Sequence, residues 1–85
     1  MITSEQIKAA RALLRWGQRD LARASRVSLP SIKRLETIPG PLRARESTIE
    51  ALRRALEEAG IEFTDGTSPG VSLGRLAGVR RSAGK

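Results

Sequence analysis

The sequence contains no cysteine, no histidine and no tyrosine, and only one tryptophan and one phenylalanine. Without cysteine or histidine there can be no disulfide, no thiol or imidazole catalysis and none of the usual zinc sites. Two aromatic residues are too few for a platform that stacks single-stranded bases. No apolar run approaches the roughly 20 residues of a membrane span, and the N-terminus lacks the apolar core of a signal peptide. We therefore expect a small cytoplasmic protein without metal or cofactor.

Acidic side chains are scarce and unevenly placed. Sixteen Lys and Arg against nine Asp and Glu give a net charge of +7. Residues 1–45 hold ten cations and three anions, residues 46–66 two cations and six anions, and residues 67–85 four cations and no anion. A basic lobe beside an acidic one indicates a polyanionic partner on one face. The competing interpretation is an arginine-rich surface that is merely solvated.

The N-terminal half is predicted to contain three short helices. Thr3 and Gln6 fit a capping box, in which the hydroxyl and the amide each satisfy a free backbone N–H. Apolar residues then recur at helical spacing to about Leu14. A second helix is expected over residues 18–24 and, after a tight turn, a third over residues 29–37.

The C-terminal half is predicted to begin with the clearest helix of the chain. Ser47 and Glu50 fit a second capping box, and the helix is expected to end near Ala59, before Gly60. Two segments that alternate apolar and polar residues then flank a turn composition, which is typical of a β-hairpin. The apolar face of this hairpin consists of Ile61, Phe63, Val71 and Leu73.

The third helix has one apolar and one polar face. Placed at about 100° per residue, Ile32 and Leu35 point to one side, toward a core. Lys33 and Arg34 point to the other side together with Pro30, and Leu29 lies at the edge. Two short helices joined by a tight turn, the second with exposed cations, form a helix-turn-helix pattern.

One ion pair is expected between helices. Arg11 lies at the border of the apolar stripe of the first helix, and Glu36 lies at the matching border of the third. A charge held against a core needs a partner. We therefore expect Arg11 and Glu36 to form a structural salt bridge.

On these residues the chain resembles the phage-repressor-type (Xre/Cro-like) helix-turn-helix regulators of bacteria. The resemblance lies in AARALLRWGQRDLARASRVSLPSIKRLE, residues 9–36, and extends more loosely through TIEALRRALEEAGIEF, residues 48–63. It implies a mainly α protein with a four-helix Xre/Cro-like DNA-binding domain, residues 1–60. We expect the β-hairpin, residues 61–74, to follow as a dimerisation element, and residues 75–85 to form a flexible basic tail.

The resemblance also implies roles in binding double-stranded DNA. Gln18 looks like the residue that holds a phosphate and braces the third helix. The positions similar to those that read bases are Leu29, Pro30, Lys33 and Arg34. The positions expected to contact phosphate are Gln18, Arg19, Ser28, Ser31, Arg43 and Arg45.

Two departures from the family pattern affect these expectations. The family commonly has glycine in the turn where this chain has Arg26. Members that read bases through amides have Gln or Asn where this chain has Leu29 and Pro30, which offer only apolar contact, for example to a thymine methyl. Hydrogen-bonded readout is then expected to come mainly from Arg34 and Lys33.

We therefore predict a sequence-specific DNA-binding transcriptional regulator that binds a palindromic operator as a homodimer, with residues 29–37 in the major groove. The alternative is an antitoxin that neutralises a protein toxin and autoregulates its operon. An enzyme is not expected, because no residues form a positioned nucleophile–base pair.

The hairpin is expected to form the dimer interface. A lone two-stranded hairpin is marginal in water, and its apolar face can be covered either by the fourth helix of its own chain or by a second copy. We favour the second copy. The predicted interface residues are Ile61, Phe63, Val71 and Leu73.

Overall fold

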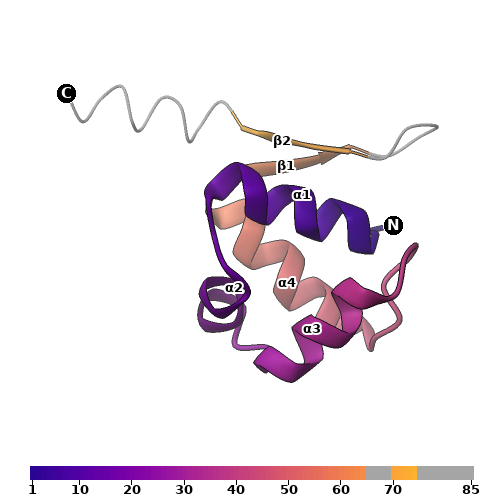
Figure 1. The fold of residues 1–85 in the computed structure, drawn as a ribbon. Coiled ribbons are helices and arrows are strands. Elements are labelled where there is room, and N and C mark those ends of the chain that lie inside the picture. Colours follow the sequence, from indigo (N-terminus) through magenta and orange to yellow (C-terminus); the bar gives the residue numbers. More distant parts are fainter. Residues whose placement is uncertain (65–69, 75–85) are drawn as a thin grey trace.

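A computed structural model describes residues 1–64 and 70–74 of the chain. These residues form four helices, α1 (Ser4–Leu14), α2 (Gln18–Ser25), α3 (Leu29–Thr37) and α4 (Glu46–Glu58), followed by an antiparallel hairpin of β1 (Ile61–Thr64) and β2 (Gly70–Leu73) (Figure 1). The predicted mainly α architecture with a C-terminal hairpin is confirmed. None of the described helices is long and apolar enough to cross a membrane. The predicted basic tail lies outside the described residues.

The start of α1 is the predicted capping box, and it also holds the hairpin. The Gln6 N–H donates to Thr3 Oγ1 over 3.1 Å, and the Thr3 N–H donates to Gln6 Oε1 over 2.9 Å. The amide nitrogen of Gln6 then donates to the carbonyls of Thr64 and Gly70, at 3.1 and 2.9 Å. One buried side chain therefore caps its own helix and ties both strands of the hairpin to α1.

The N-terminal segment also holds the loop that follows α3. The Ser4 N–H donates to Gly40 O over 2.8 Å, the Leu42 N–H donates to Ile2 O over 3.1 Å, and the Gly40 N–H donates to a Glu5 carboxylate oxygen over 3.2 Å. Gly40 has a φ of +92°, which a residue with a Cβ rarely adopts. These bonds hold the loop that leads to Arg43 and Arg45 against the start of α1.

The turn between α2 and α3 contains a residue in the left-handed region of backbone conformation. Arg26 has φ 64° and ψ 19°, in the left-handed region, and its N–H donates to Ala22 O at the end of α2. Ser28 then caps α3 by accepting the Ser31 N–H over 3.3 Å, and Pro30 lies in the first helical turn. The predicted turn therefore forms with Arg26 at its strained position.

Arg26→Gly is expected to raise the free energy of unfolding by up to about 1 kcal/mol, because glycine adopts a positive φ without the clash of a Cβ. Arg23→Gly, within α2, is the matched control. It is expected to lower the free energy of unfolding by about 1 kcal/mol, since glycine is a poor helix former. Urea denaturation measures both values. A destabilised Arg26→Gly variant would show that the arginine side chain contributes more than its backbone conformation costs.

The fourth helix begins earlier than predicted. It starts at Glu46, after Arg45 in an extended conformation, and no side chain caps it. The Arg45 carbonyl accepts the N–H groups of Thr48 and Ile49, both at 3.0 Å, so Ser47 already lies inside the helix. The predicted capping box of Ser47 and Glu50 is therefore wrong. The end of α4 is as predicted, with Gly60 at φ +109° after Ala59.

The core lies between the helices and the inner face of the hairpin. Its most deeply buried large side chains are Ile7, Leu21, Ile32, Leu52, Leu56 and Ile61. α1 packs against β2 and α3, α2 against α3 and α4, and α4 against β1. The hairpin and α3 consequently lie on opposite sides of the molecule (Figure 1).

The hairpin face is largely covered by its own chain, whereas the prediction favoured a second copy as its cover; whether a second copy also pairs with the hairpin stays a prediction. Ile61 is only 2% exposed, and Phe63 and Val71 are partly buried against the core. Leu73 is 38% exposed. The physical reason is that α1 packs against β2 and α4 packs against β1, so that both strands lie on helices of their own chain. Ile61 and Phe63 are therefore not a free dimer face, whereas the outer edge of β2 carries Val71 and Leu73.

Candidate nucleic-acid interface

The outer face of α3 presents the residues predicted to read bases. Ile32 and Leu35 are buried in the core, at 1% and 3% exposure. Pro30, Lys33 and Arg34 are exposed, and Leu29 is half-buried at the edge of this face. The helical wheel drawn from the sequence therefore describes α3 correctly. Its polar face is free of contacts with other helices that would hide it.

A cation-lined hollow lies between α3 and the start of α2. Its volume is about 550 Å³. The residues that line it are Gly17, Gln18, Arg19, Asp20, Arg23, Leu29 and Lys33. Asp20 is engaged locally, because its carboxylate accepts the Gly17 N–H over 2.7 Å. The structure thus brings the predicted phosphate residues Gln18 and Arg19 beside Lys33.

A second hollow lies on the other side of α3, against the start of α4. Its volume is about 560 Å³, and Arg26, Arg34 and Arg45 line it together with Ser28 and Ser31. Ser28 Oγ accepts the Ser31 N–H and donates to Ser31 Oγ over 2.8 Å. Arg43 is exposed but does not line this hollow.

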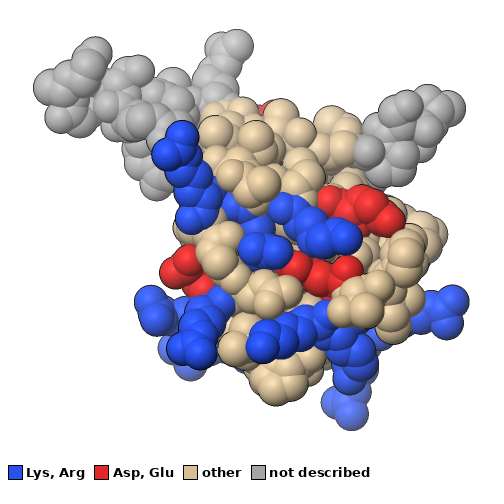
Figure 2. Space-filling view, in the orientation of Figure 1, with Lys and Arg blue, Asp and Glu red and all other residues tan. Residues whose placement is uncertain are grey.

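Positive charge gathers around both hollows. Figure 2 shows Lys and Arg side chains spread over α2 and α3, at the end of the molecule away from the hairpin, and further ones over α1. Arg23 and Arg26 line the hollows but were absent from the predicted contact residues. The sequence pattern that indicates these two residues is the spacing of Arg19, Arg23 and Arg26, which places three cations within two helical turns.

A buried ion pair fixes α3 relative to the first two helices. Arg11 Nε and Nη2 each donate to a Glu36 carboxylate oxygen over 2.7 Å, and Arg11 Nη1 donates to Trp16 O over 3.0 Å. The Glu36 side chain is 5% exposed and that of Arg11 is 19% exposed. The predicted pair is therefore present as a bidentate bridge, the strongest geometry for such a contact.

Gln18 joins this pair from the start of α2. Its amide nitrogen donates to Glu36 Oε1 over 3.0 Å. Burial raises the pKa of Glu36, but the hydrogen bonds from Arg11 and Gln18 outweigh this effect and hold the pKa below its usual value. Glu36 therefore stays ionised and links α1, α2 and α3. The brace expected of Gln18 is present, while its contact with phosphate stays a prediction.

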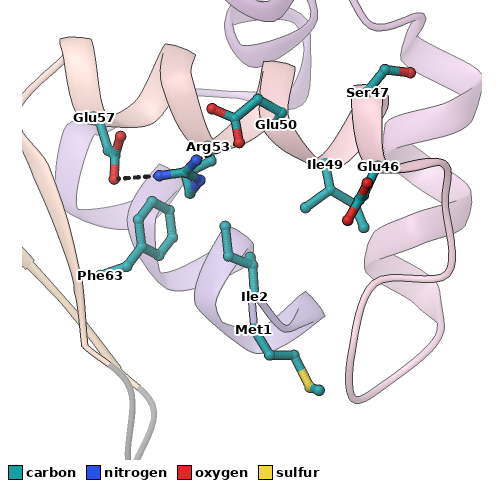
Figure 3. A pocket seen from close by; sticks show the side chains of 9 residues that line it. All are labelled: Met1, Ile2, Glu46, Ser47, Ile49, Glu50, Arg53, Glu57 and Phe63. Carbon is teal, nitrogen blue, oxygen red and sulfur yellow. Dashed lines mark hydrogen bonds and ion pairs between the residues drawn. The ribbon is translucent and has the colours of Figure 1, made fainter.

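A third hollow, of about 670 Å³, has the opposite electrostatic character. Ile2, Ile49 and Phe63 form its apolar part, and α4 contributes acidic side chains around it (Figure 3). Arg53 is paired there with Glu50 and, over 3.4 Å, with Glu57. Because carboxylates repel phosphates, this surface is unsuited to nucleic acid.

No family model matches the sequence, and comparison with curated proteins and with solved structures finds no similar chain. The fold and the surface define a small, mainly helical protein that concentrates its positive charge around one exposed helix.

Proposed function

We propose that this chain is a sequence-specific double-stranded DNA-binding transcriptional regulator of the Xre/Cro-like helix-turn-helix kind. It binds a palindromic operator as a homodimer, with α3 in the major groove. The observation that carries this proposal is the exposed face of α3, with Lys33 and Arg34, lying between two cation-lined hollows.

An exposed helix flanked by cations suits a major groove. The groove is about 12 Å wide and admits one α-helix, and a phosphate backbone runs along each of its walls. With α3 in the groove, one hollow brings Gln18 and Arg19 toward one backbone, and the other brings Ser28 and Arg45 toward the second. Phosphate contacts of this kind position a protein without reading sequence.

Base readout falls to the side chains that project furthest from α3. An arginine can donate two hydrogen bonds to O6 and N7 of guanine, and apolar side chains can contact the methyl group of thymine. Pro30 and Arg34 are four residues apart, about 6 Å along the helix, or roughly two base-pair steps. The preferred half-site should therefore contain a guanine read by Arg34 and, about two steps away, a thymine beside Leu29 and Pro30.

The network around Glu36 supports readout without touching DNA. It holds the start of α2, which carries Gln18 and Arg19, at a fixed position against the end of α3. Phosphate contacts from α2 and base contacts from α3 then stay in register. Specific binding needs this, because a small displacement of the helix moves every hydrogen bond off its base edge.

Selection of bound sites from random double-stranded DNA tests the proposal. The expected result is a two-fold symmetric motif with half-site centres about one helical turn apart, roughly 10 base pairs. Binding without enrichment of any motif would reduce the proposal to a nonspecific DNA-binding protein. Failure to bind DNA even at low salt would overturn it.

Arg45→Ala is expected to weaken binding to specific and random DNA by the same factor, because Arg45 lies where a phosphate would be held. The slope of log K against log salt should fall in magnitude by about 0.9, as expected for the loss of one phosphate contact. Fluorescence anisotropy over a salt series measures both quantities, and Arg43→Ala is expected to behave similarly.

Arg54→Ala is the matched control for Arg45, because it removes an exposed cation from α4 that lines neither hollow beside α3. Its salt dependence should equal that of the unaltered protein. If Arg45→Ala weakened binding to the specific site but not to random DNA, Arg45 would read a base rather than hold a phosphate.

The alternative, an antitoxin that also binds DNA, has one observation in its favour. The acid-rimmed hollow of Figure 3 combines apolar residues with carboxylates on a side that the DNA proposal does not use. A basic toxin segment would be complementary to it. Ile49→Glu should then abolish neutralisation of a purified candidate toxin while leaving DNA binding unchanged. If the variant still neutralised the toxin, this hollow would not be the toxin-binding site.

A further inference from the structure

The outer edge of β2 carries backbone groups that no described residue satisfies. In the hairpin, Ile61 lies opposite Leu73 and Phe63 opposite Val71. Beyond them the Gly74 N–H donates to Gly60 O. Hydrogen-bonded and non-hydrogen-bonded pairs alternate along an antiparallel ladder. Because Gly60 and Gly74 form a hydrogen-bonded pair, the pairs Ile61–Leu73 and Phe63–Val71 are both non-hydrogen-bonded. The N–H and C=O groups of Val71 and Leu73 therefore point away from β1.

Two large apolar side chains of β2 and α1 are exposed. Leu73 is 38% exposed and Leu13 is 41% exposed. Leu13 follows Gln6 by two helical turns and so lies on the same side of α1, and Gln6 bonds the carbonyl of Gly70 at the start of β2. α1 and β2 run in the same direction (Figure 1).

We propose that the edge of β2 pairs with β2 of a second copy of this chain, antiparallel and centred on Ser72. Val71 and the partner's Leu73 then exchange N–H···O bonds, and symmetry repeats the exchange at the other end, which gives four hydrogen bonds. Ser72 faces the partner's Ser72 as a non-hydrogen-bonded pair. The product is a four-stranded sheet.

The hydrogen-bonding phase selects this register. A shift of one residue would place Ser72 opposite the partner where a hydrogen-bonded residue is needed. The backbone N–H and C=O of Ser72 point toward β1 and cannot reach the partner strand. A shift of the centre to Val71 or to Leu73 pairs one of them with a residue outside β2. Only the register centred on Ser72 uses both outward-facing residues of the strand.

The strand is suited to a second copy rather than to solvent. Natural edge strands are commonly blocked by lysine, other charges or proline, and Gly70–Leu73 reads GVSL, with none of these. Val71 and Leu73 share the face toward α1, so the pairing sets Val71 beside the partner's Leu73 and covers the exposed leucine. Four strands over helices are also more stable than an isolated pair.

The pairing is compatible with DNA and deepens the proposed function by identifying the interface of the homodimer. The two-fold axis of an antiparallel edge pairing at Ser72 runs perpendicular to the sheet. Since α3 lies on the far side of α1 and α4 from the hairpin (Figure 1), the axis brings both copies of α3 to the same side of the new sheet. Both can then face one duplex.

Ser72→Cys tests the pairing directly, because the chain has no other cysteine. Opposed residues in a non-hydrogen-bonded pair have Cα atoms about 4.5 Å apart, within the range of a disulfide. Oxidation without DNA should give a covalent dimer at least about tenfold faster than in the control, because pairing raises the local thiol concentration. The control is Glu62→Cys, on the same outer face but about 14 Å from its symmetry mate, three strand spacings away.

Equal cross-linking rates for the two variants, or none for either, would overturn the pairing. Leu73→Pro provides a second measurement, since it removes an outward N–H and leaves the bonds to β1 intact. It should sediment as a monomer with unchanged helical circular dichroism, and a persistent dimer would also overturn the proposal. A cross-linked dimer that selects no DNA motif would sink the proposed function and leave the interface standing.

Discussion

Glu36→Ala is expected to lower the free energy of unfolding by about 3 kcal/mol or more, because removing one partner of a buried pair leaves the other charge uncompensated. Arg11 would keep only its bond to Trp16 O, and the Gln18 amide would lose its acceptor. For a domain of this size the melting temperature should fall by at least about 12 °C. Thermal denaturation followed by circular dichroism measures the change.

Two controls separate the buried pair from an ordinary surface pair. Glu57→Ala removes a half-exposed carboxylate that pairs with Arg53 and should cost less than about 1 kcal/mol. Glu36→Gln keeps an acceptor without the charge and should fall between the two. If Glu36→Ala melted like the unaltered protein but lost DNA binding, the pair would serve recognition rather than folding.

The Glu36 carboxylate also makes the free energy of unfolding depend on pH. The pKa of Glu36 in the folded chain lies below its usual value of 4.5, so the unfolded chain takes up the proton first. The stabilisation is fully present above pH 4.5 and is lost as the pH falls through the lowered pKa. The unaltered protein should therefore lose stability more steeply in this range than Glu36→Gln, as urea titrations at several pH values will show.

Arg34→Ala is expected to weaken binding to the best selected site by about 1–3 kcal/mol, or roughly 5- to 150-fold, through the loss of a bidentate contact to guanine. One base position in the selected motif should become degenerate. Arg34 is exposed and bonds to no described residue, so folding should be unaffected. Competition binding against sites changed at single positions measures both effects.

The comparison with random DNA decides what Arg34 does. If its removal costs the same on specific and random sequences, Arg34 holds phosphate and the readout belongs to other residues of α3. Lys33→Ala is the neighbouring comparison, with a smaller effect expected because an ammonium lacks the fork that matches guanine. Arg54→Ala should leave affinity on both kinds of DNA unchanged.

Features that depend on neighbours a few residues apart could be predicted from the sequence. The capping box of Thr3 and Gln6 and the cap of Ser28 are set by short-range hydrogen bonds. The buried and exposed sides of α3 follow from the 3.6-residue repeat. The Arg11–Glu36 pair could also be predicted, because each charge borders an apolar stripe and needs a partner there.

Only the tertiary structure decided which distant segments form hydrogen bonds with one another. The pattern at Ser47 and Glu50 is locally a good capping box, but the helix starts at Glu46, where the Arg45 carbonyl accepts its first N–H groups. The bonds from Gln6 to Thr64 and Gly70 span about 60 positions of the chain, and no local pattern indicates them.

The hairpin shows the same division most clearly. Its strands and its apolar face follow from alternation along the sequence, whereas its covering depends on how much apolar surface α1 and α4 leave open. The sequence by itself determined the elements, their faces and the excess of positive charge. Packing between distant segments decided that the hairpin face is buried in its own chain and that the β2 edge remains open, because burial and hydrogen bonding are satisfied in three dimensions and not along the chain.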